Sequence, residues 1–333
     1  MYGNLYWRKW YDESQEVKKL FSRLINASPE EVSLIENTSM GLNLAANSIK
    51  WEPGDNIVIN DLEFPTNIFP WQVQARKHGL EIRVAKNRNG RLDIDVYEKL
   101  VDDHTKVIAL SWVEFSNGYV HDLKALSELA HTHGAYLVVD GIQGVGALKI
   151  DVRETDVDVI VCGAQKWLMG LPGTGLMYIK KSVLDELEVS FGGWLGDEKP
   201  FEFAYREYSP VRSARRFELG TPNFVGYYVL KSSLELILSI GINNIQNRDL
   251  ELAGYLIEKV QDIAKIASPL NNGKPESPII SLEVPDAENI VNALWNEDKI
   301  RVAARMGRIR VSPHFYNNEE DIDKLVEALR KRL

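Results

Sequence analysis

The stretch AYLVVDGIQGVGALKIDVRETDVDVIVCGAQK, residues 135–166, contains two runs of mostly apolar side chains that lead to polar residues. Ala135–Val139 is followed by Asp140, and Val157–Cys162 is followed shortly by Lys166. Both runs are rich in valine and are apolar at successive positions, which is typical of strands buried on both faces. The stretch therefore predicts neighbouring strands of a mainly parallel sheet that helices cover.

The same pattern recurs on either side of this stretch. Helical patterns lie between the apolar runs: Pro65–His78 ends at Gly79, and Leu123–His133 ends at Gly134. This alternation of strands and helices predicts a layered α/β domain. Further strands are expected at Asn56–Asn60, Glu81–Ala85, Val107–Trp112 and Gly175–Lys180.

The last third of the chain has a different character. Two long helical stretches, about Phe224–Ser239 and Arg248–Ala267, precede short strands, and an amphipathic helix begins at about Glu319. We expect a large α/β domain, residues 1–230, followed by a smaller α+β domain, residues 231–333. The short strands are expected at Ile279–Glu283, Ile300–Ala304 and Arg308–Val311.

Length, charge and composition narrow the class of protein. A chain of 333 residues suggests roughly two domains, and a net charge of −9 argues against nucleic acid and anionic membranes as partners. No run reaches the ~18 apolar residues of a membrane helix, and the first residues lack a signal-peptide pattern. The one cysteine, Cys162, excludes an internal disulfide, and the six histidines show no metal-ligand spacing. We expect a cytoplasmic protein without a metal site.

Three polar side chains fall where a ligand of an open α/β sheet binds, beyond the carboxyl ends of the strands. Asp140, Gln143 and Lys166 together fit pyridoxal phosphate, because that cofactor needs an amine for a Schiff base and a carboxylate for its ring nitrogen. Gln143 would donate a hydrogen bond to the ring oxygen, and Lys166 would act as general base at Cα. Each alone has an ordinary alternative, a solvated lysine or a turn aspartate. Their joint spacing favours the cofactor site.

The cofactor phosphate needs a second site. Residues 36–41, ENTSMG, precede the helical pattern Leu42–Ile49. Hydroxyls and free amides at a helix start bind anions, so we expect Thr38, Ser39 and Met40 to hold the phosphate. An ordinary Ser/Thr helix cap is the alternative interpretation.

Two further side chains complete the expected site. Phe64 follows the strand that ends near Asn60, where an aromatic ring could stack on the cofactor; a core phenylalanine is the alternative. Arg310 alternates with Ile309 and Val311, so it faces away from one apolar surface, and its fork suits an α-carboxylate. The alternative for Arg310 is a surface arginine.

These segments together resemble the class V aminotransferase family of fold-type I pyridoxal-phosphate enzymes. That family includes cysteine desulfurases and kynureninase-like and isopenicillin-N epimerase-like proteins. The resemblance covers about Ser28 to the end of the chain. The matching motifs are Asn37-Thr-Ser, Val139-Asp-Gly-Ile-Gln143, Gly163-Ala-Gln-Lys166, Phe217-Glu-Leu-Gly-Thr-Pro222 and Arg310-Val-Ser-Pro-His-Phe-Tyr-Asn317.

The resemblance implies a large domain with a mainly parallel seven-stranded sheet between helices, a small C-terminal α+β domain and a homodimer. It implies that Lys166 forms the Schiff base, that Asp140 pairs with the ring nitrogen and that Arg310 binds the substrate carboxylate. The implied phosphate ligands are Thr38, Ser39 and Gln165, with Thr221 reaching the phosphate of the partner subunit.

Three features depart from the family pattern. Desulfurases carry a catalytic cysteine on a loop that here is Val302–Gly307, VAARMG, and Cys162 is expected to be buried packing. Because a desulfurase needs a nucleophilic thiolate, the sequence disfavours that activity. Phe64 stands where desulfurases place a histidine, which favours the epimerase-like and kynureninase-like branches. The N-terminal segment is shorter than in the family, and we expect an aromatic cluster there to pack on the partner subunit or to replace that segment. The cluster is Tyr2, Tyr6, Trp7 and Trp10.

The sequence therefore predicts a pyridoxal-phosphate enzyme that acts at the Cα of an amino acid or related amine through a Lys166 aldimine. An aminotransferase is favoured. An amino-acid epimerase or racemase and a β-lyase are alternatives, and so is a non-catalytic binding or regulatory protein on this fold. The glycines of residues 141–146, GIQGVG, lack the order of a dinucleotide fingerprint, which disfavours a nicotinamide oxidoreductase.

Overall fold

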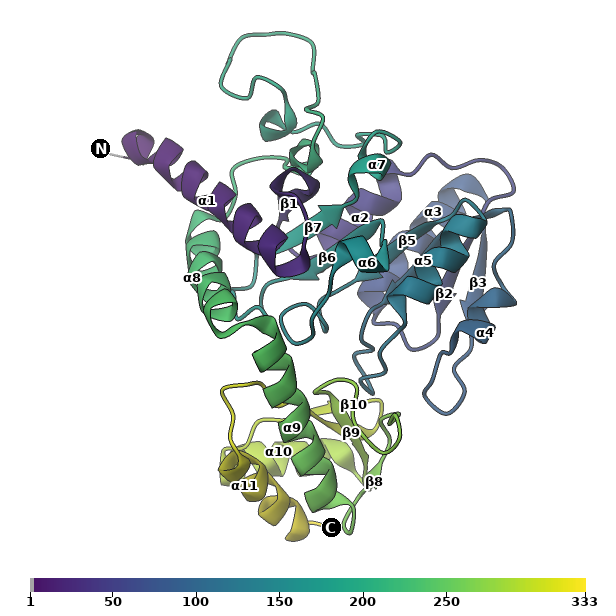
Figure 1. Ribbon diagram of the computed structural model, residues 1–333, viewed down its shortest axis with the longest axis vertical. Helices are drawn as coiled ribbons and strands as arrows, with labels where there is room; N and C mark the ends of the chain where they lie inside the picture. Colours follow the sequence, from purple (N-terminus) through teal and green to yellow (C-terminus); the bar gives the residue numbers. More distant parts are fainter. Residues whose placement is uncertain (1–2) are drawn as a thin grey trace.

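A computed structural model describes residues 3–333, with side chains from Tyr6 onward. It contains a seven-stranded sheet between helices and, below it in Figure 1, a four-stranded sheet with its own helices. The strands of the larger sheet follow the order β1-β7-β6-β5-β4-β2-β3. They are β1 (Val32–Ile35), β2 (Asn56–Asn60), β3 (Glu81–Ala85), β4 (Thr105–Ser111), β5 (Tyr136–Asp140), β6 (Val159–Gly163) and β7 (Gly175–Ile179).

The larger sheet is mainly parallel, as predicted. Strands β2 to β6 run parallel to one another, whereas β7 pairs antiparallel with β6 and β1 pairs antiparallel with β7. The six strands expected from the sequence are all present within two residues of their predicted ends, and β1 was not predicted.

Each face of this sheet has its own hydrophobic core, which explains the continuous apolar runs. Leu137 and Val139 of β5 point into one core, and Val138 between them points into the other. The first core is covered by α1 (Gly3–Ile25), α4 (Ile94–Glu98), α5 (Leu123–Thr132), α6 (Val152–Thr155) and α8 (Phe224–Ile240). The second is covered by α2 (Thr38–Ser48), α3 (Phe69–His78) and α7 (Lys181–Leu184).

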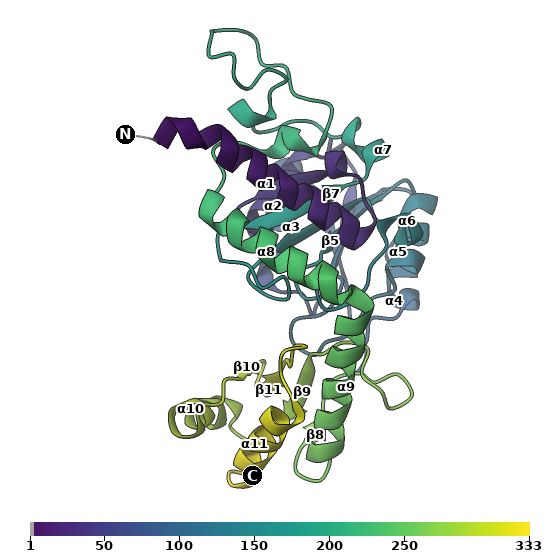
Figure 2. The ribbon, with the colours of Figure 1, turned by 60° about the vertical axis from the view of Figure 1, so that its left-hand side comes forward.

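The smaller sheet is antiparallel, in the order β10-β11-β9-β8, and helices cover one of its faces (Figure 2). Ile309, Val311 and Leu282 pack against those helices, so Arg310, between the first two, faces the other way. The strands are β8 (Lys265–Ile266), β9 (Ile280–Glu283), β10 (Ala303–Arg305) and β11 (Arg308–Val311). The helices are α9 (Ile242–Val260), α10 (Ala287–Asp298) and α11 (Glu319–Arg330).

Expectations for one strand and one helix of the last third were wrong in detail. The strand predicted at Ile300–Ala304 is β10, which begins at Ala303 and ends at Arg305. The helix predicted at Arg248–Ala267 begins earlier, at Ile242, and ends at Val260. Residues 265–266 instead pair as β8 with β9. A domain boundary at residue 230 stays a prediction.

Helices α8 and α9 meet at Gly241 with a bend of 84°. Gly241 has φ 87° and ψ 129°, a backbone conformation that residues with a Cβ avoid. Within the described residues, no single helix is long and apolar enough to cross a membrane. This bent pair meets that test only when both helices are taken together, by length and composition.

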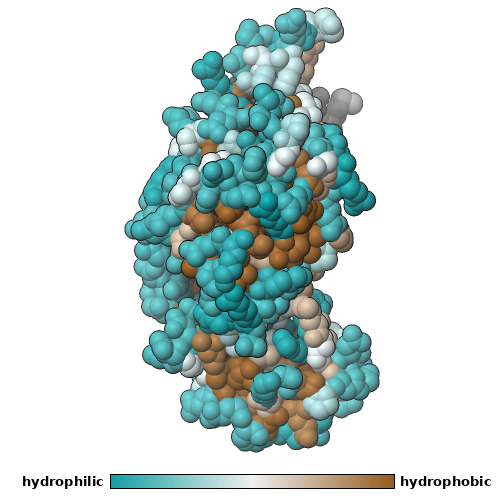
Figure 3. Space-filling model, turned by 90° about the vertical axis from the view of Figure 1, so that its right-hand side faces the viewer, coloured by the Kyte–Doolittle hydropathy of each residue, from teal (hydrophilic) through white to brown (hydrophobic). Residues whose placement is uncertain are grey.

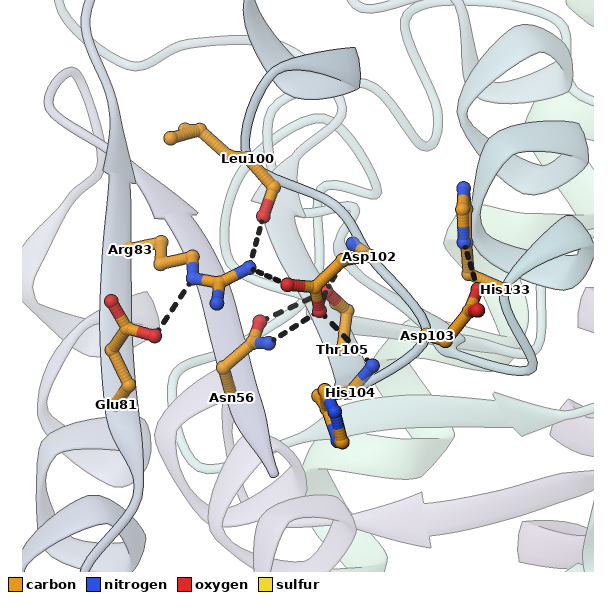
Figure 4. Close-up of polar contacts among 9 residues, drawn as sticks. All are labelled: Asn56, Glu81, Arg83, Leu100, Asp102, Asp103, His104, Thr105 and His133. Atoms are coloured by element: carbon orange, nitrogen blue, oxygen red, sulfur yellow. Dashed lines mark hydrogen bonds and ion pairs between the residues drawn. The ribbon is translucent and has the colours of Figure 1, made fainter. Parts of the chain in front are cut away.

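The amino ends of β2, β3 and β4 are tied together by polar contacts (Figure 4). Arg83 of β3 donates hydrogen bonds of 2.7 Å to Asp102 Oδ2 and to the carbonyl of Leu100. Asn56 of β2 donates to Asp102 Oδ1 at 2.9 Å. The hydrogen bond from Arg83 lowers the pKa of Asp102 to about 2, so this end of the sheet keeps its ion pair over the physiological range. The carboxyl ends of the strands carry a different set of side chains.

The aromatic residues near the N-terminus pack within the chain. Trp7 on α1 stacks on Tyr11 with 5.4 Å between ring centroids, and it also contacts Trp194 and Phe224 at 5.5 and 5.6 Å. Tyr2 of the predicted aromatic cluster lies outside the described residues. Whether the cluster meets a partner subunit stays a prediction.

Helix α2 lies so close to β6 that Gly41 has no room for a side chain. A Cβ at Gly41 would lie 2.4 Å from Val161 Cγ1 and 2.6 Å from Ile35 Cδ1. We expect Gly41→Val to lower the free energy of unfolding by roughly 1–3 kcal/mol, the usual cost of overpacking. Denaturant unfolding measures this. Gly254→Ala on α9 is the control: its Cβ would meet nothing within 4 Å, and it should leave stability unchanged or raise it. Equal losses in both variants would contradict the prediction.

Candidate functional site

A cavity of about 250 Å³ lies at the carboxyl ends of β4, β5 and β6. It brings together seven of the side chains predicted from sequence, although they come from positions more than 100 residues apart. These are Thr38, Ser39, Phe64, Asp140, Gln143, Gln165 and Lys166. Asn37, Thr66, Ser111, Phe115 and Ile142 also line it.

Lys166 follows β6 and is open to the cavity. Burial by the surrounding protein lowers the pKa of its ammonium group to about 8; Asp140 opposes this shift, while Arg310 and Arg305 add to it. Among the described residues, no hydrogen bond or ion pair holds this amine. It is therefore available as a nucleophile near neutral pH.

Asp140 is the last residue of β5 and is only 2% exposed. The backbone N–H of Ile142 donates to its Oδ1 at 3.0 Å. Burial raises the pKa of Asp140 to about 6, and the attraction of Lys166 is a weaker, opposing influence. A buried carboxylate with so little compensation suits a cationic partner such as a protonated ring nitrogen.

Gln143 provides a direct test of whether pyridoxal phosphate fits. Trp167 Nε1 donates to Gln143 Oε1 at 3.1 Å, which fixes the orientation of the amide because an indole N–H can only donate. Gln143 Nε2 is then buried without an acceptor among residues 3–333. A cofactor ring oxygen would satisfy this donor, so the residues present fit the group.

The start of α2 is arranged to bind an anion. Asn37 caps the helix by accepting from the Met40 N–H at 2.9 Å, and Thr38 Oγ1 accepts from the Gly163 N–H at 2.9 Å. The N–H groups of Thr38 and Ser39 belong to the first turn, which has no acceptors within the helix. Ser39 Oγ also contacts Thr66 Oγ1. Met40, by contrast, has its N–H engaged by the cap and does not line the cavity.

Two aromatic rings form a wall of the cavity. Phe64 is 47% exposed and stands edge-on to Phe115, with 5.2 Å between ring centroids and 76° between ring planes. An exposed ring at the edge of a cavity is available to stack on a flat ligand. Phe64 therefore lines the cavity, and its stacking role stays a prediction.

Behind the cavity lies a buried acidic group that the sequence reasoning missed. Ser111 Oγ donates to Glu63 Oε2 at 2.6 Å, and Asn60 and Asn67 also donate to Glu63. Burial raises the pKa of Glu63 to about 7, against the hydrogen bonds from Ser111, which lower it. A polar cluster directly after a buried strand, Asn60-Asp-Leu-Glu63, was the available signal.

The remaining predicted residues, Arg310 and Thr221, lie outside this cavity. Arg310 on β11 reaches the cavity wall, where its Nη1 donates to the carbonyl of Phe115 at 2.7 Å. Burial, and then Arg305, lower the pKa of Arg310 to about 10. Thr221 lines a separate small pocket with Gly173 and Asn223. The roles of all the predicted site residues, inside and outside this cavity, stay predictions.

A second contact joins the small sheet's region to the Lys166 segment. His314 Nε2 lies 3.2 Å from the carbonyl of Trp167, and His314 Nδ1 lies 3.1 Å from Asp249 Oδ2 on α9. The ring also stands edge-on to Trp167 at 4.9 Å. No cluster of three or more His, Cys, Asp or Glu side chains arranged for a metal occurs in the described part of the chain.

Comparison with known proteins identifies relatives over nearly the whole chain. The family model described as Aminotransferase class-V matches residues 6–325. The uncharacterized aminotransferase YcbU of Bacillus subtilis (strain 168) is 28% identical, over 99% of this chain and 86% of its own length. A cysteine desulfurase of Escherichia coli (strain K12 / DH10B) is 30% identical, over 96% of this chain and 82% of its own length.

Solved structures agree with the fold. The apo structure of a cysteine desulfurase from Thermococcus onnurineus NA1 has a TM-score of 0.89 and 26% identity, covering 98% of this chain and 84% of that one. The cystine C-S lyase C-DES, in complex with its product cysteine persulfide, has a TM-score of 0.89 and 21% sequence identity. The match covers 99% of this chain and 88% of that one. The expected arrangement, a mainly parallel seven-stranded sheet with a smaller C-terminal α+β part, is confirmed.

Proposed function

Because the chain belongs to the class-V aminotransferase family, we propose that it is an aminotransferase acting at the Cα of an amino acid. The chain is a pyridoxal-phosphate-dependent enzyme of fold type I. When bound, pyridoxal phosphate supplies an electron sink that stabilises negative charge at the substrate Cα. The protein must hold that group, orient the substrate and move a proton.

The site residues divide these tasks. Lys166 would hold the cofactor covalently and then move a proton at the substrate Cα. Asp140 would keep the ring nitrogen protonated, and Gln143 Nε2 would donate to the ring oxygen. The cofactor phosphate would be bound by Thr38, Ser39 and Gln165. Arg310 would bind the substrate carboxylate.

One observation carries the choice of reaction. Among the described residues, Lys166 is the one side chain lining the cavity that can act as a base at Cα, since Asp140 is the other titratable group and would pair with the ring. Transamination needs one base that moves a proton along one side of the substrate. Epimerisation is best served by proton donors on both sides of Cα, and the described residues of this chain that line the cavity include no second donor of that kind. This supports an aminotransferase over an epimerase or racemase.

Cysteine desulfurase is the second candidate, because the relatives from Escherichia coli carry that name at 30% identity. Against it stands the chemistry of Cys162, the one cysteine in the sequence. It is 1% exposed on β6, and burial raises the pKa of its thiol, so a nucleophilic thiolate is strongly disfavoured there. The prediction against desulfurase activity therefore stays a prediction.

An experiment in heavy water separates the reactions. The holoenzyme is mixed with amino acids, and the products and the cofactor spectrum are followed. Keto acid together with the amine form of the cofactor supports transamination. Deuterium at Cα without keto acid would instead show epimerisation, and sulfide released from cysteine would show desulfurase or lyase chemistry.

We also propose a cytoplasmic homodimer with Thr221 near the partner's site. Large apolar side chains are exposed on the segment after α7, among them Phe201 at 42%, Phe203 at 87% and Tyr205 at 106%. The face drawn in Figure 3 carries a band of hydrophobic residues across the large part of the molecule and another patch on the smaller part. Such exposed apolar surface is typical of subunit contacts. Light scattering on the purified protein would measure its mass and so test the dimer. The unpaired Cys162 supports the proposed location, because free thiols are typical of a reducing compartment.

The pH dependence of cofactor uptake tests the environment of Lys166. We expect the rate to rise with pH and to level off near pH 8, because the pKa of Lys166 is lowered to about 8 and only the neutral amine is nucleophilic. If the lysine had its ordinary pKa of about 10.4, the rate of cofactor uptake would still rise with pH well above pH 8. Stopped-flow absorbance measures the uptake by apoenzyme. Asp140→Asn should move the plateau to lower pH, since Asp140 raises the pKa of Lys166. A wild-type plateau at the ordinary lysine value would contradict the first expectation, and an unchanged or higher plateau in Asp140→Asn would contradict the second.

A further inference from the structure

The open face of the smaller sheet carries three arginines. Arg310 pairs with Ala303 across the β10–β11 ladder, and Arg305 pairs with Arg308. Directly paired residues, and residues two apart on one strand, lie on the same face of a sheet. Since Ile309 and Val311 face the helices, the three arginines share the opposite face.

The three arginines differ in whether an acidic side chain compensates them. Arg308 lies close enough to Glu283 that it helps to lower the pKa of that carboxyl, after the larger effect of Lys265. Arg305 makes a 2.7 Å hydrogen bond to the carbonyl of Ala304, and Arg310 makes one to the carbonyl of Phe115. Neither has a carboxylate within 4 Å among the residues described. Two cations on one face therefore lack counter-ions.

Arg310 has a free donor as well. Its Nε is buried and has no acceptor in the described part of the protein. A buried guanidinium with an unused N–H costs free energy unless a ligand completes it. The free donor therefore points to an anion that is part of the bound state.

Arg305 and Arg310 line one cavity, of about 620 Å³, at the edge of the smaller sheet. Arg301 adds a third cation to its lining, and Glu288 is the one acidic side chain that the described residues place there, so this lining carries an excess of positive charge. Both Arg305 and Arg310 also contribute to the lowered pKa of Lys166, which places both within electrostatic reach of the reacting amine. The cavity and the Lys166 site thus adjoin through Arg310.

We propose that the substrate carries a second acidic group, and that Arg305 binds it while Arg310 binds the α-carboxylate. Arg305 and Arg310 are diagonal neighbours across the ladder, roughly 7–8 Å apart at the backbone, from where their long side chains can converge on a C4 or C5 diacid. This inference rests on the proposed function, because it assigns the substrate class of that same site. Amino acids with an acidic side chain are the class that fits.

Binding of unreactive acids tests this without relying on turnover. The holoenzyme is titrated by calorimetry with glutarate and with pentanoate, which have the same number of carbons and differ in the second carboxylate. We expect glutarate to bind at least about 10-fold more tightly, as a charge-assisted hydrogen bond provides. Arg305→Gln should lower the affinity for glutarate to that for pentanoate. The affinity for pentanoate should stay unchanged.

Arg308→Gln is the matched control, since Arg308 lies on the same face but has an acidic neighbour. It should keep the 10-fold preference. Equal binding of the two acids to the wild-type protein would overturn the proposal, and so would equal losses in the Arg305 and Arg308 variants. Retained cofactor colour shows that each variant is folded.

The same proteins separate this inference from the reaction itself. Turnover of glutamate and glutamine, which are nearly the same shape, should favour glutamate in the wild-type protein, and Arg305→Gln should raise the KM for glutamate with little change in kcat. If glutarate is preferred but no amino acid gives keto acid, the aminotransferase proposal fails and the second anion site stands. If keto acid forms from neutral amino acids without any preference for acidic ones, the anion site fails and the reaction stands.

Discussion

We expect Lys166→Ala to purify without borohydride-stable pyridoxal phosphate and to turn over about 10²–10⁴-fold more slowly, the usual contribution of a positioned acid–base group. Lys166 is the one amine that lines the cavity, and no partner among the described residues ties it down. Its removal therefore takes away both the covalent attachment and the base at Cα. Visible absorbance and mass spectrometry after borohydride measure the loss of covalent attachment, and product assays measure the loss of turnover.

Lys331→Ala on the surface after α11 is the control for this variant, because Lys331 pairs only with an exposed Glu327. It should keep full colour and rate. Small primary amines added to Lys166→Ala should restore part of the proton transfer. If the Lys166→Ala protein still carries covalently bound cofactor, the attachment is at another lysine and the assignment of Lys166 is wrong.

The second large effect is expected at Asp140. Removing one partner of a buried charge pair costs roughly 2–5 kcal/mol, so Asp140→Asn should slow turnover by roughly 30- to 5,000-fold. The same substitution should stabilise the apoprotein. Because the pKa of Asp140 is raised to about 6, the folded state holds its proton more tightly than the unfolded state does. Stability is therefore lost as the pH rises from the unfolded value to about 6, by about 3 kcal/mol in total.

Thermal or denaturant unfolding of the apoprotein at several pH values checks the sign. Wild-type stability should fall across that window through this group, and Asp140→Asn should lack that fall. A structural role for Asp140 would give the opposite result, a less stable apoprotein. Opposite effects on apoprotein stability and on turnover identify a residue kept for its function.

Much of the larger sheet could be predicted because its strands are buried on both faces. The runs at Val107–Trp112 and Ala135–Val139 lack the recurring polar positions that a surface helix would require; Ser111, near the end of the first run, is an isolated polar residue. The strand β1 has only four residues, which is too short for a periodic signal, and it owes its place to pairing with β7. Helix α1 was missed because aromatic and charged residues mix in its first turns, and packing on α8 stabilises it.

Tertiary pairing also explains the misplaced end of α9. Residues 263–267, IAKIA, are compatible with a helix or a strand when taken alone. Pairing of Lys265 and Ile266 with β9 decides for the strand. The start of α9 was hidden because Asn243 and Asn244 have low helix propensity.

The candidate site was predictable where one strand end supplies a residue with a known chemical role. Asp140, Gln143 and Lys166 each lie at or within three residues of the end of a strand, and all three line one cavity. Thr66 and Ser111 could not be found in this way, because a hydroxyl gains a role only through the partners that folding brings to it. Arg305 was missed for a related reason: its significance depends on the ladder register with Arg308.

Because α8 and α9 meet at the bend at Gly241, a small rotation there displaces the far end of α9. A helix of 19 residues is about 28 Å long at 1.5 Å per residue, so a rotation of about 2° at its base moves the far end by about 1 Å. Placement errors of about 1 Å can cost about 100-fold in rate. The placement of Arg310 relative to Lys166 therefore depends in part on the torsion angles of one glycine remote from the cavity. With Arg310 in its proposed role, a change at Gly241 would alter substrate preference while every residue that touches the ligand stays the same.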